Sequence, residues 1–258
     1  MQAETAIGAV VAGLGLVVAA IALSRWQRLG LVPNILIATG RAVLQLIVLG
    51  YVLSVVFAPP QSPVLILFVV AILLIVAAIV TRNRISQKLP RLLPWVIGSV
   101  LVSTALTVGY TQLLIVRSQP WYDPQFLIPL SGIVLSNAMN GATIAGERLV
   151  SAFASHQAEI ETHLSLGATP THAIAAHRRD AIRAGVLPTL NTMTIVGLAT
   201  LPTVLSGQLL GGADPVSAIA LEIIILIMLA FSTLVVTIAL TSGICRQFFN
   251  DAAQLLNL

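Results

Sequence analysis

Polar side chains recur at helical spacing inside apolar stretches of this sequence, and they are the residues that could handle a polar solute. One stretch carries Ser136, Asn140, Thr143 and Glu147 at spacings of four, three and four residues, with Asn137 beside them. Asn, Ser and Thr within a membrane either line a solute pathway or form hydrogen bonds between helices. Both interpretations stay open for Asn137 and Asn140.

Two further stripes add an arginine and a carboxylate. Arg41 and Gln45 lie four residues apart in one apolar run, and Glu222 shares a helix face with Thr233 in another. Gln45 and Glu222 are candidates for the same pathway, and hydrogen bonding between helices is the open alternative for Gln45. An arginine at mid-membrane costs about 2.5–3.5 kcal/mol, so Arg41 must face protein or water. We expect Arg41 to pair with Glu222 or with backbone carbonyls, because a buried cation would repel a cationic substrate.

Covalent and metal chemistry lack their usual motifs. The chain has no HExxH or GxSxG sequence, and its one lysine, Lys88, lies outside any GxxxxGK[ST] phosphate loop. The lone Cys245 excludes an internal disulfide, and the four histidines are expected to be solvated or interfacial. The sequence therefore predicts no enzyme and no cofactor in this chain, and it leaves any metal site unknown.

The elements that position these residues are membrane helices. The 258 residues are 57% hydrophobic and only 9% charged, which is too little charge to coat a water-facing surface. Apolar runs of 18 or more residues predict an all-α, polytopic membrane helix bundle. We expect one transmembrane domain over 1–258. The net charge of +4 is assigned to membrane-flanking loops rather than to nucleic-acid binding.

Hydropathy predicts seven spans. They are Thr5–Ser24, Leu31–Phe57, Pro63–Thr81, Leu92–Val116, Phe126–Gly146, Leu187–Leu210 and Pro215–Ser242. Eleven of the thirteen Lys and Arg residues fall on one side of this arrangement, which identifies that side as the cytoplasm. This asymmetry predicts that the N-terminus lies outside and the C-terminus in the cytoplasm. We expect the membrane to be a bacterial-type plasma (inner) membrane.

The longest water-exposed segment is the predicted cytoplasmic stretch 147–186. Its first helix shows one apolar face, made of Leu149, Phe153, Ile160 and Leu164. Gly167 is expected to end that helix, and Thr169 with Pro170 to cap and start the next. Farther on, Pro188 and Pro202 are expected to kink the sixth span. The kinks either free carbonyls for a pathway or serve packing.

The helix break is similar to a loop of many ABC permeases, Glu-Ala-Ala-x-x-x-Gly, which docks on the ATPase. Glu161 precedes Gly167 by the same six residues, although no proline follows at the importer spacing. An ordinary helix–Gly–helix turn is the alternative. On the docking interpretation the coupling residues are Glu159, Glu161, Leu164, Leu166, Gly167, Ala168 and Thr169.

A wider set of motifs resembles the FetB/YbbM-type ABC exporter permease family, which includes bacterial iron-export and plant aluminium-tolerance permeases. The matching stretches are 40–46, 137–140, 161–169, 188–193, 201–202 and 206–215. The resemblance adds Asn191, Met193 and Gln208 to the candidate pathway. It implies a homodimer in the lipid bilayer, driven by a separate ATPase that holds ATP and Mg, and export of a metal, chiefly iron.

Two departures from the family pattern bear on the metal. Residues 203–207 are Thr-Val-Leu-Ser-Gly where the family has Gly-Met-Met-Thr-Gly, and Leu221-Glu222 replaces Tyr-Gln. The missing thioethers would be soft metal ligands, so the sequence leaves the metal open. The alternative function is a standalone secondary transporter of a small polar or ionic solute. It would need mid-membrane carboxylates for a coupling ion, and only Glu222 qualifies.

Overall fold

The computed structural model describes residues 3–59, 62–85, 89, 91–250 and 254–255, with side chains described from Ala12 onward in the first helix. The helices in chain order are α1 (Ala3–Trp26), α2 (Val32–Val56), α3 (Pro63–Ile85), α4 (Leu92–Tyr110), the π-helix η1 (Thr111–Val116), α5 (Pro124–Ser155), α6 (Gln157–Ser165), α7 (Pro170–Ala173), α8 (Ala175–Ile195), α9 (Thr203–Leu210) and α10 (Pro215–Gln247). β-Structure within the described ranges is limited to two isolated bridges, which confirms the all-α prediction.

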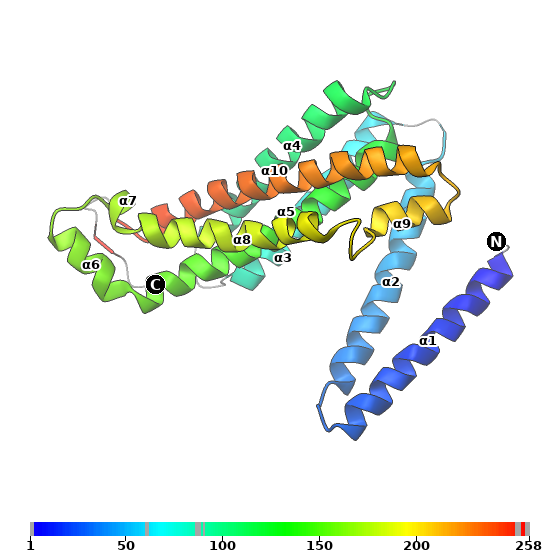
Figure 1. The fold of residues 1–258 in the computed structure, drawn as a ribbon, viewed down its shortest axis with the longest axis horizontal. Helices are drawn as coiled ribbons and strands as arrows, with labels where there is room; N and C mark the ends of the chain where they lie inside the picture. Colours follow the sequence, from blue (N-terminus) through cyan, green and yellow to red (C-terminus); the bar gives the residue numbers. More distant parts are fainter. Residues whose placement is uncertain (1–2, 60–61, 86–88, 90, 251–253, 256–258) are drawn as a thin grey trace. The chain divides into compact units, whose positions relative to one another are not determined.

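The chain divides into two units, Met1–Gln61 and Ser62–Leu258. The first unit is a hairpin of α1 and α2, joined by a short turn (Figure 1). Apolar side chains such as Leu44, Leu46 and Ile47 are exposed along α2. This hairpin therefore buries little of its own surface, as expected for helices whose apolar side chains contact lipid.

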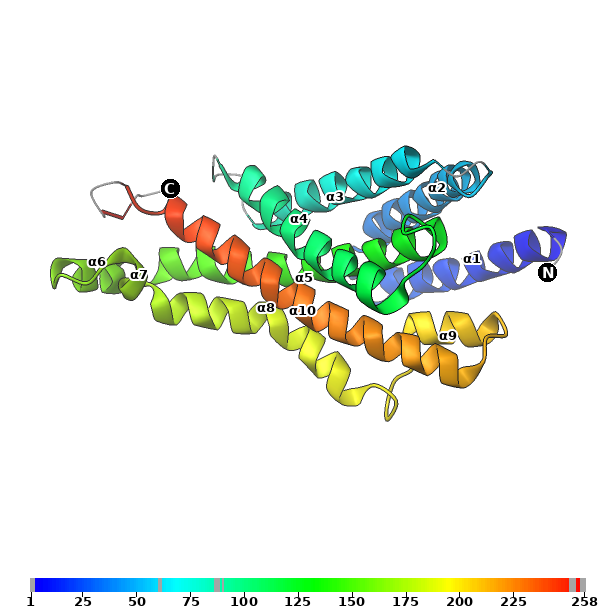
Figure 2. The same cartoon turned by 90° about the horizontal axis from the view of Figure 1, so that it is seen from above.

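In the second unit, α5 and α10 are the central helices, and α3, α4 and α8 pack against them (Figure 2). Leu135, Ala138, Val236 and Leu240 are almost completely buried where α5 meets α10. Burial of small residues such as Ala138 brings the backbones close, as in membrane helix packing generally. This bundle forms the core that positions the polar residues discussed below.

The buried threonine hydroxyls of α10 donate their hydrogen bonds to carbonyls of the same helix. Thr233, Thr237 and Thr241 are completely buried, and each donates to the carbonyl four residues earlier at 2.7–2.8 Å. At its start the helix is capped by Asp214, which accepts the backbone N–H and the hydroxyl of Ser217. These hydrogen bonds, the backbone one first, lower the pKa of Asp214.

Within the described residues, five helices are long and apolar enough to cross a membrane: α2, α3, α4 continued by η1, α5 and α10. They correspond to five of the seven predicted spans. The first predicted span is α1, whose apolar described part, Ala12–Trp26, is shorter. The prediction of a polytopic helix bundle is confirmed.

The sixth predicted span, Leu187–Leu210, is not one helix. α8 ends at Ile195, the backbone turns over 196–202, and α9 starts at Thr203. Gly197 adopts φ +78°, where its N–H donates to the Thr200 carbonyl. A positive φ is unfavourable for residues other than glycine and breaks the helical hydrogen-bond ladder. Of the two prolines expected to kink this span, Pro188 lies inside α8, and Pro202 is the N-cap of α9.

The first helix of the predicted segment 147–186 is also interrupted. α5 runs on to Ser155, and a turn at His156 separates it from α6. The turn directs α6 so that Ile160 enters the same core as Leu149 and Phe153, and Leu164 packs against that core. Apolar spacing had identified these four residues correctly, but a single straight helix was wrong.

Candidate functional site

Asn137 is the centre of a polar junction between three helices. Its amide nitrogen on α5 donates to Thr189 Oγ1 on α8 at 3.1 Å, and to Thr233 Oγ1 on α10 at 2.6 Å. The Leu229 carbonyl on α10 accepts a third contact at 3.3 Å. Thr189 donates back to the Asn137 Oδ1 at 3.4 Å. The side chain therefore joins α5, α8 and α10.

Close backbone approach makes this junction possible. A Cβ built on Gly185 of α8 would lie 2.6 Å from the Gly141 carbonyl and 2.9 Å from Thr237 Cγ2. Only glycine leaves room for such an approach between α5, α8 and α10. A Cβ built on Gly146 would likewise clash with the Ile85 side chain of α3, whereas a Cβ on Gly132 would meet no atom within 4 Å.

A small polar cavity of about 110 Å³ lies beside the junction, between α5 and α8. Its lining includes Asn137, Asn140, Pro188, Thr189 and Thr192. Asn140 is exposed, and the described residues offer its side chain no hydrogen-bond partner. The two asparagines predicted as a pair are thus brought together but differ in their surroundings.

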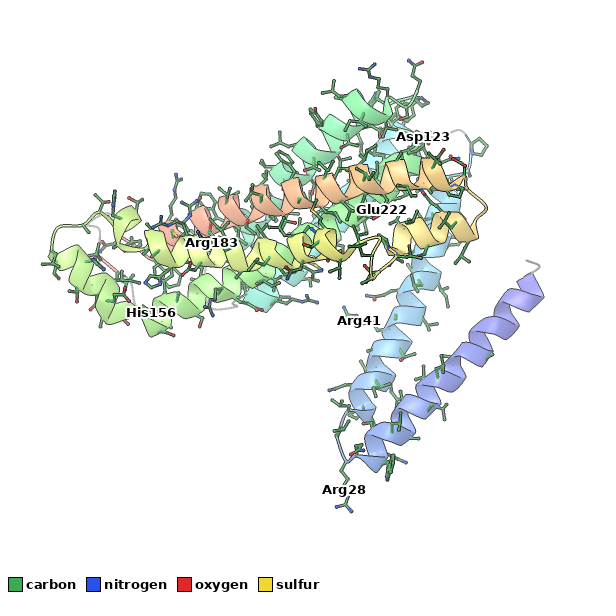
Figure 3. The ribbon with its side chains drawn as sticks, in the orientation of Figure 1. Arg28, Arg41, Asp123, His156, Arg183 and Glu222 are labelled. Carbon is green, nitrogen blue, oxygen red and sulfur yellow. The ribbon has the colours of Figure 1, made fainter. Side chains whose placement is uncertain are left out.

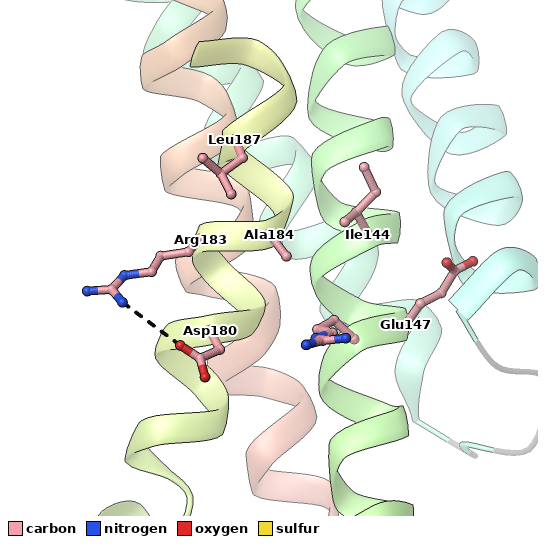
Figure 4. Close-up of a pocket in the computed structure, with 7 residues that line it drawn as sticks. Ile144, Glu147, Asp180, Arg183, Ala184 and Leu187 are labelled. Carbon is pink, nitrogen blue, oxygen red and sulfur yellow. Dashed lines mark ion pairs between the residues drawn. The ribbon is translucent and has the colours of Figure 1, made fainter. Parts of the chain in front are cut away.

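A wider, open pocket of about 610 Å³ continues from this cavity along α5 and α8, with Ile144 lining both (Figure 4). Four charged side chains line it: Glu147, Arg148, Asp180 and Arg183. Arg183 and Asp180 form an exposed ion pair at 4.0 Å, which contributes little to stability. The cavity and the pocket together form one polar groove, which we call the α5–α8 groove.

Other predicted pathway residues lie outside this groove. Asn191 is exposed and Met193 half-buried on α8, and Gln208 is half-buried on α9. Gln45 and Arg41 are exposed on α2 in the first unit, so the pairing of Arg41 with Glu222 stays a prediction.

Glu222 is buried on α10, in a part of the helix that packs against α9 (Figure 3). Only 6% of the residue is exposed, and the described residues provide no hydrogen-bond partner for its Oε2. A carboxyl group in this state is costly inside a membrane and commonly marks function. It lies apart from the α5–α8 groove, since neither of the two pockets that form the groove includes it.

The predicted coupling residues surround the break between α6 and α7. Gly167 adopts φ +90°, and Thr169 caps α7 by accepting the His172 N–H at 3.4 Å, as expected. Leu166 is 80% exposed, although Leu164 two residues earlier is partly buried. The break therefore presents a leucine to its surroundings at the end of the bundle that carries α6 and α7 (Figure 1). Glu161 is exposed and accepts from Gln157 at 2.9 Å, and Ala168 is half-buried.

A contact that the sequence does not predict lies at this end of the bundle. The rings of His156, at the α5–α6 turn, and His177, on α8, lie 4.6 Å apart, and His177 Nε2 is 3.8 Å from Glu159 Oε1 (Figure 3 labels His156). No sequence signal links residues 21 positions apart on different helices. In the part of the chain that the structure describes, no group of three or more His, Cys, Asp or Glu is placed to hold a metal ion.

Comparisons with known proteins cover nearly the whole chain. The profile of a family described as "Uncharacterised protein family (UPF0014)" matches residues 7–249. "UPF0014 membrane protein slr1647" of Synechocystis sp. is 49% identical over 243 residues, covering 94% of this chain and 93% of the relative. No solved structure matches significantly.

Two further relatives have informative names. "Probable iron export permease protein FetB" of Escherichia coli is 34% identical over 244 residues, covering 94% of this chain and 92% of that protein. "Protein ALUMINUM SENSITIVE 3" of Arabidopsis thaliana is 31% identical over 245 residues, covering 95% and 88%.

Proposed function

The chain belongs to the UPF0014 family of membrane proteins, and from this premise we propose that it is the membrane-spanning permease of an ABC-type exporter. A separate ATPase, which holds ATP and Mg, drives the transport. The substrate is a metal ion, and the name of the relative FetB supports iron. The protein acts in a bacterial-type plasma membrane, with its N-terminus outside, as one transmembrane domain in each of two identical copies.

The observation that carries this proposal is the exposed break between α6 and α7. Leu166 is 80% exposed beside Gly167, and Glu161 lies on the helix just before it. An exposed leucine on a short helical knob, with two carboxylates on the preceding helix, suits a groove on another protein better than water. Burial of one leucine at an interface is worth about 1.5–3 kcal/mol. A docking partner is therefore the simplest explanation for this knob.

The pathway in this proposal follows the α5–α8 groove. Asn140, Thr192 and Pro188 line its narrow part. Amide, hydroxyl and carbonyl oxygens are hard ligands that suit a metal ion carrying part of its water shell. Because the groove is open along its side, the second copy of the chain would close it.

The experiment pairs the permease with its ATPase. Leu166→Ala and Glu161→Arg are each co-expressed with the ABC ATPase encoded nearest to the permease gene, and co-purification and the ATP hydrolysis rate are measured. Leu166→Ala should weaken docking by one to two decades, since about 1.4 kcal/mol corresponds to tenfold. Glu161→Arg should weaken it more, because repulsion replaces attraction.

Leu210→Ala is the matched control. Leu210 is 90% exposed on α9, at the other end of the same bundle (Figure 1). Its variant should bind and stimulate the ATPase like the parent protein. If both coupling variants also do so, the knob is not the docking element and the ABC proposal loses its main support.

A second candidate function is a standalone secondary transporter, which the buried carboxyl group of Glu222 favours. Such a transporter would move solute in vesicles without ATP, using an ion gradient. Glu222→Gln would abolish that transport. Transport that instead requires the ATPase and ATP would exclude this alternative.

A further inference from the structure

We propose that a cleft between α7, the first turns of α8 and the end of α10 binds the headgroup of an anionic phospholipid. The cleft has a volume of about 1,100 Å³ and is separate from the α5–α8 groove. This inference goes beyond the proposed function, because it requires only that the bundle lies in a membrane.

Charge is the first argument. Arg178, Arg179 and Arg246 all line the cleft, and the described residues that line it include no acid; Asp251, next in sequence to the lining Asn250, lies outside the described residues. Three guanidinium groups around one space repel one another unless an anion lies among them. Arginine also matches phosphate oxygens with paired N–H groups.

Two of these arginines are held in place. Arg178 is half-buried and donates from Nε to Thr241 Oγ1 at 3.3 Å and from Nη2 to Ser242 Oγ at 2.6 Å and the Ile238 carbonyl at 3.3 Å. The described part of the chain gives its Nη1 no acceptor, so two N–H groups remain for a ligand. The Arg246 guanidinium lies over the Trp95 ring, 5.6 Å from its centroid, which also limits its motion.

The apolar part of the cleft favours a lipid over a soluble anion or an acidic protein segment. Ile174, Ile182 and Ile238 line it beside the arginines. Ile238 continues into an exposed apolar stripe of α10 with Phe231 and Leu234, which runs away from the cleft along a membrane-spanning helix. A phosphate at the arginines would therefore place its acyl chains along this stripe. Basic pockets at the ends of membrane helices bind anionic headgroups in this way.

The test measures lipid retention by the full-length permease. Purified protein in neutral detergent is incubated with phosphatidylglycerol or phosphatidylcholine, and bound lipid is counted by native mass spectrometry. The parent protein should retain phosphatidylglycerol preferentially. Arg178→Gln should weaken that binding about fivefold, and the triple change to Gln at 178, 179 and 246 about a hundredfold. Arg178→Lys keeps the charge and should keep most of the preference.

Arg183→Gln is the matched control, since Arg183 lies on α8 outside the cleft and pairs with Asp180. It should leave retention unchanged. Equal retention of both lipids, or an unaltered preference in the triple variant, would overturn the proposal. So would displacement of phosphatidylglycerol by equimolar inorganic phosphate, which would identify a free anion as the ligand. Loss of the partner ATPase from the triple variant with lipid retention unchanged would instead identify a protein-docking surface and also refute the lipid site.

Discussion

Asn137 and Asn140 lie less than one turn apart on α5, yet their side chains differ in hydrogen bonding. The Asn137 amide donates to acceptors on α8 and α10, whereas Asn140 is exposed in the cavity without a partner among the described residues. An amide with satisfied hydrogen bonds between helices stabilises the bundle. An amide that faces a cavity remains available to a solute. Although both residues line the cavity, we therefore expect Asn137 to act in packing and Asn140 in the pathway.

Alanine at the two positions should separate stability from transport. Asn137→Ala removes the hydrogen bonds to Thr189 and Thr233 and should lower the free energy of unfolding by about 1–2 kcal/mol. Asn140→Ala should leave stability within about 0.5 kcal/mol and reduce the transport rate. Thermal unfolding in detergent and a metal-uptake assay in inverted vesicles measure the two quantities. The reverse pattern, with a stable Asn137→Ala and a destabilised Asn140→Ala, would contradict this division.

For single residues, the sequence predicts contacts between side chains and backbone groups that are a few residues apart. Thr169 and Pro170 predicted the start of α7, because the cap hydroxyl and the N–H it accepts lie three residues apart. The ring contact between His156 and His177 could not be predicted, since it depends on where the α5–α6 turn directs each helix. The acceptors of Asn137, 52 and 96 residues away, depend on tertiary packing in the same way.

Among the elements, the crossing of α5, α8 and α10 depends on two glycines that face each other. A methyl group on Gly185 would lie 2.6 Å from the Gly141 carbonyl and 3.0 Å from Ala145 Cβ. Contact with a backbone carbonyl cannot be relieved by a side-chain rotation, so the helices would have to separate. The hydrogen bonds of Asn137 cross the same junction and would lengthen with them.

Gly185→Ala should therefore destabilise the bundle by about 1–3 kcal/mol, the usual cost of overpacking. Gly132→Ala on α5 is the matched control, because nothing lies within 4 Å of its added methyl group. Since alanine is the better helix former, that variant should be neutral or up to about 1 kcal/mol more stable. Unfolding temperatures in the same detergent compare the two. An unchanged Gly185→Ala would show that α8 packs less closely on α5 than described.

Helix existence was predictable from hydropathy, but the interruption of the sixth predicted span was not. The run 187–210 is apolar enough on average to suggest one span. Its continuity fails at Gly197, whose positive φ and local bond to Thr200 depend on the backbone rather than on hydropathy. The sequence predicted a kink at Pro202 but gave no prediction for Gly197. Glycine and proline also occur in unbroken membrane helices, so their presence alone did not decide the outcome.

On the scale of the whole molecule, the polar residues exposed on α5 and α8 must face either protein or water. Ser136, Asn140, Asn191 and Thr192 are exposed in a single copy of the chain, on helices within or next to the membrane-spanning part. Polar side chains at membrane depth face protein or water rather than lipid. Exposed Leu187 on α8 lies in the same groove, so one surface offers both apolar and polar contacts. A second copy placed on this surface would shield them and would close the α5–α8 groove.

In a two-fold symmetric dimer, a residue near the symmetry axis lies opposite the same residue of the second copy. A cysteine at such a position can therefore cross-link the two copies. In a variant whose native Cys245 is replaced by Ala, Leu187→Cys should form a disulfide between two copies when membranes are oxidised. Leu106→Cys on α4 is the matched control, because the two leucines are similarly exposed, 52% and 50%, and Leu106 lies outside the groove. It should stay monomeric on a non-reducing gel. Cross-linking through Leu106 without cross-linking through Leu187 would move the dimer face to α4 and leave the α5–α8 groove without its proposed cover.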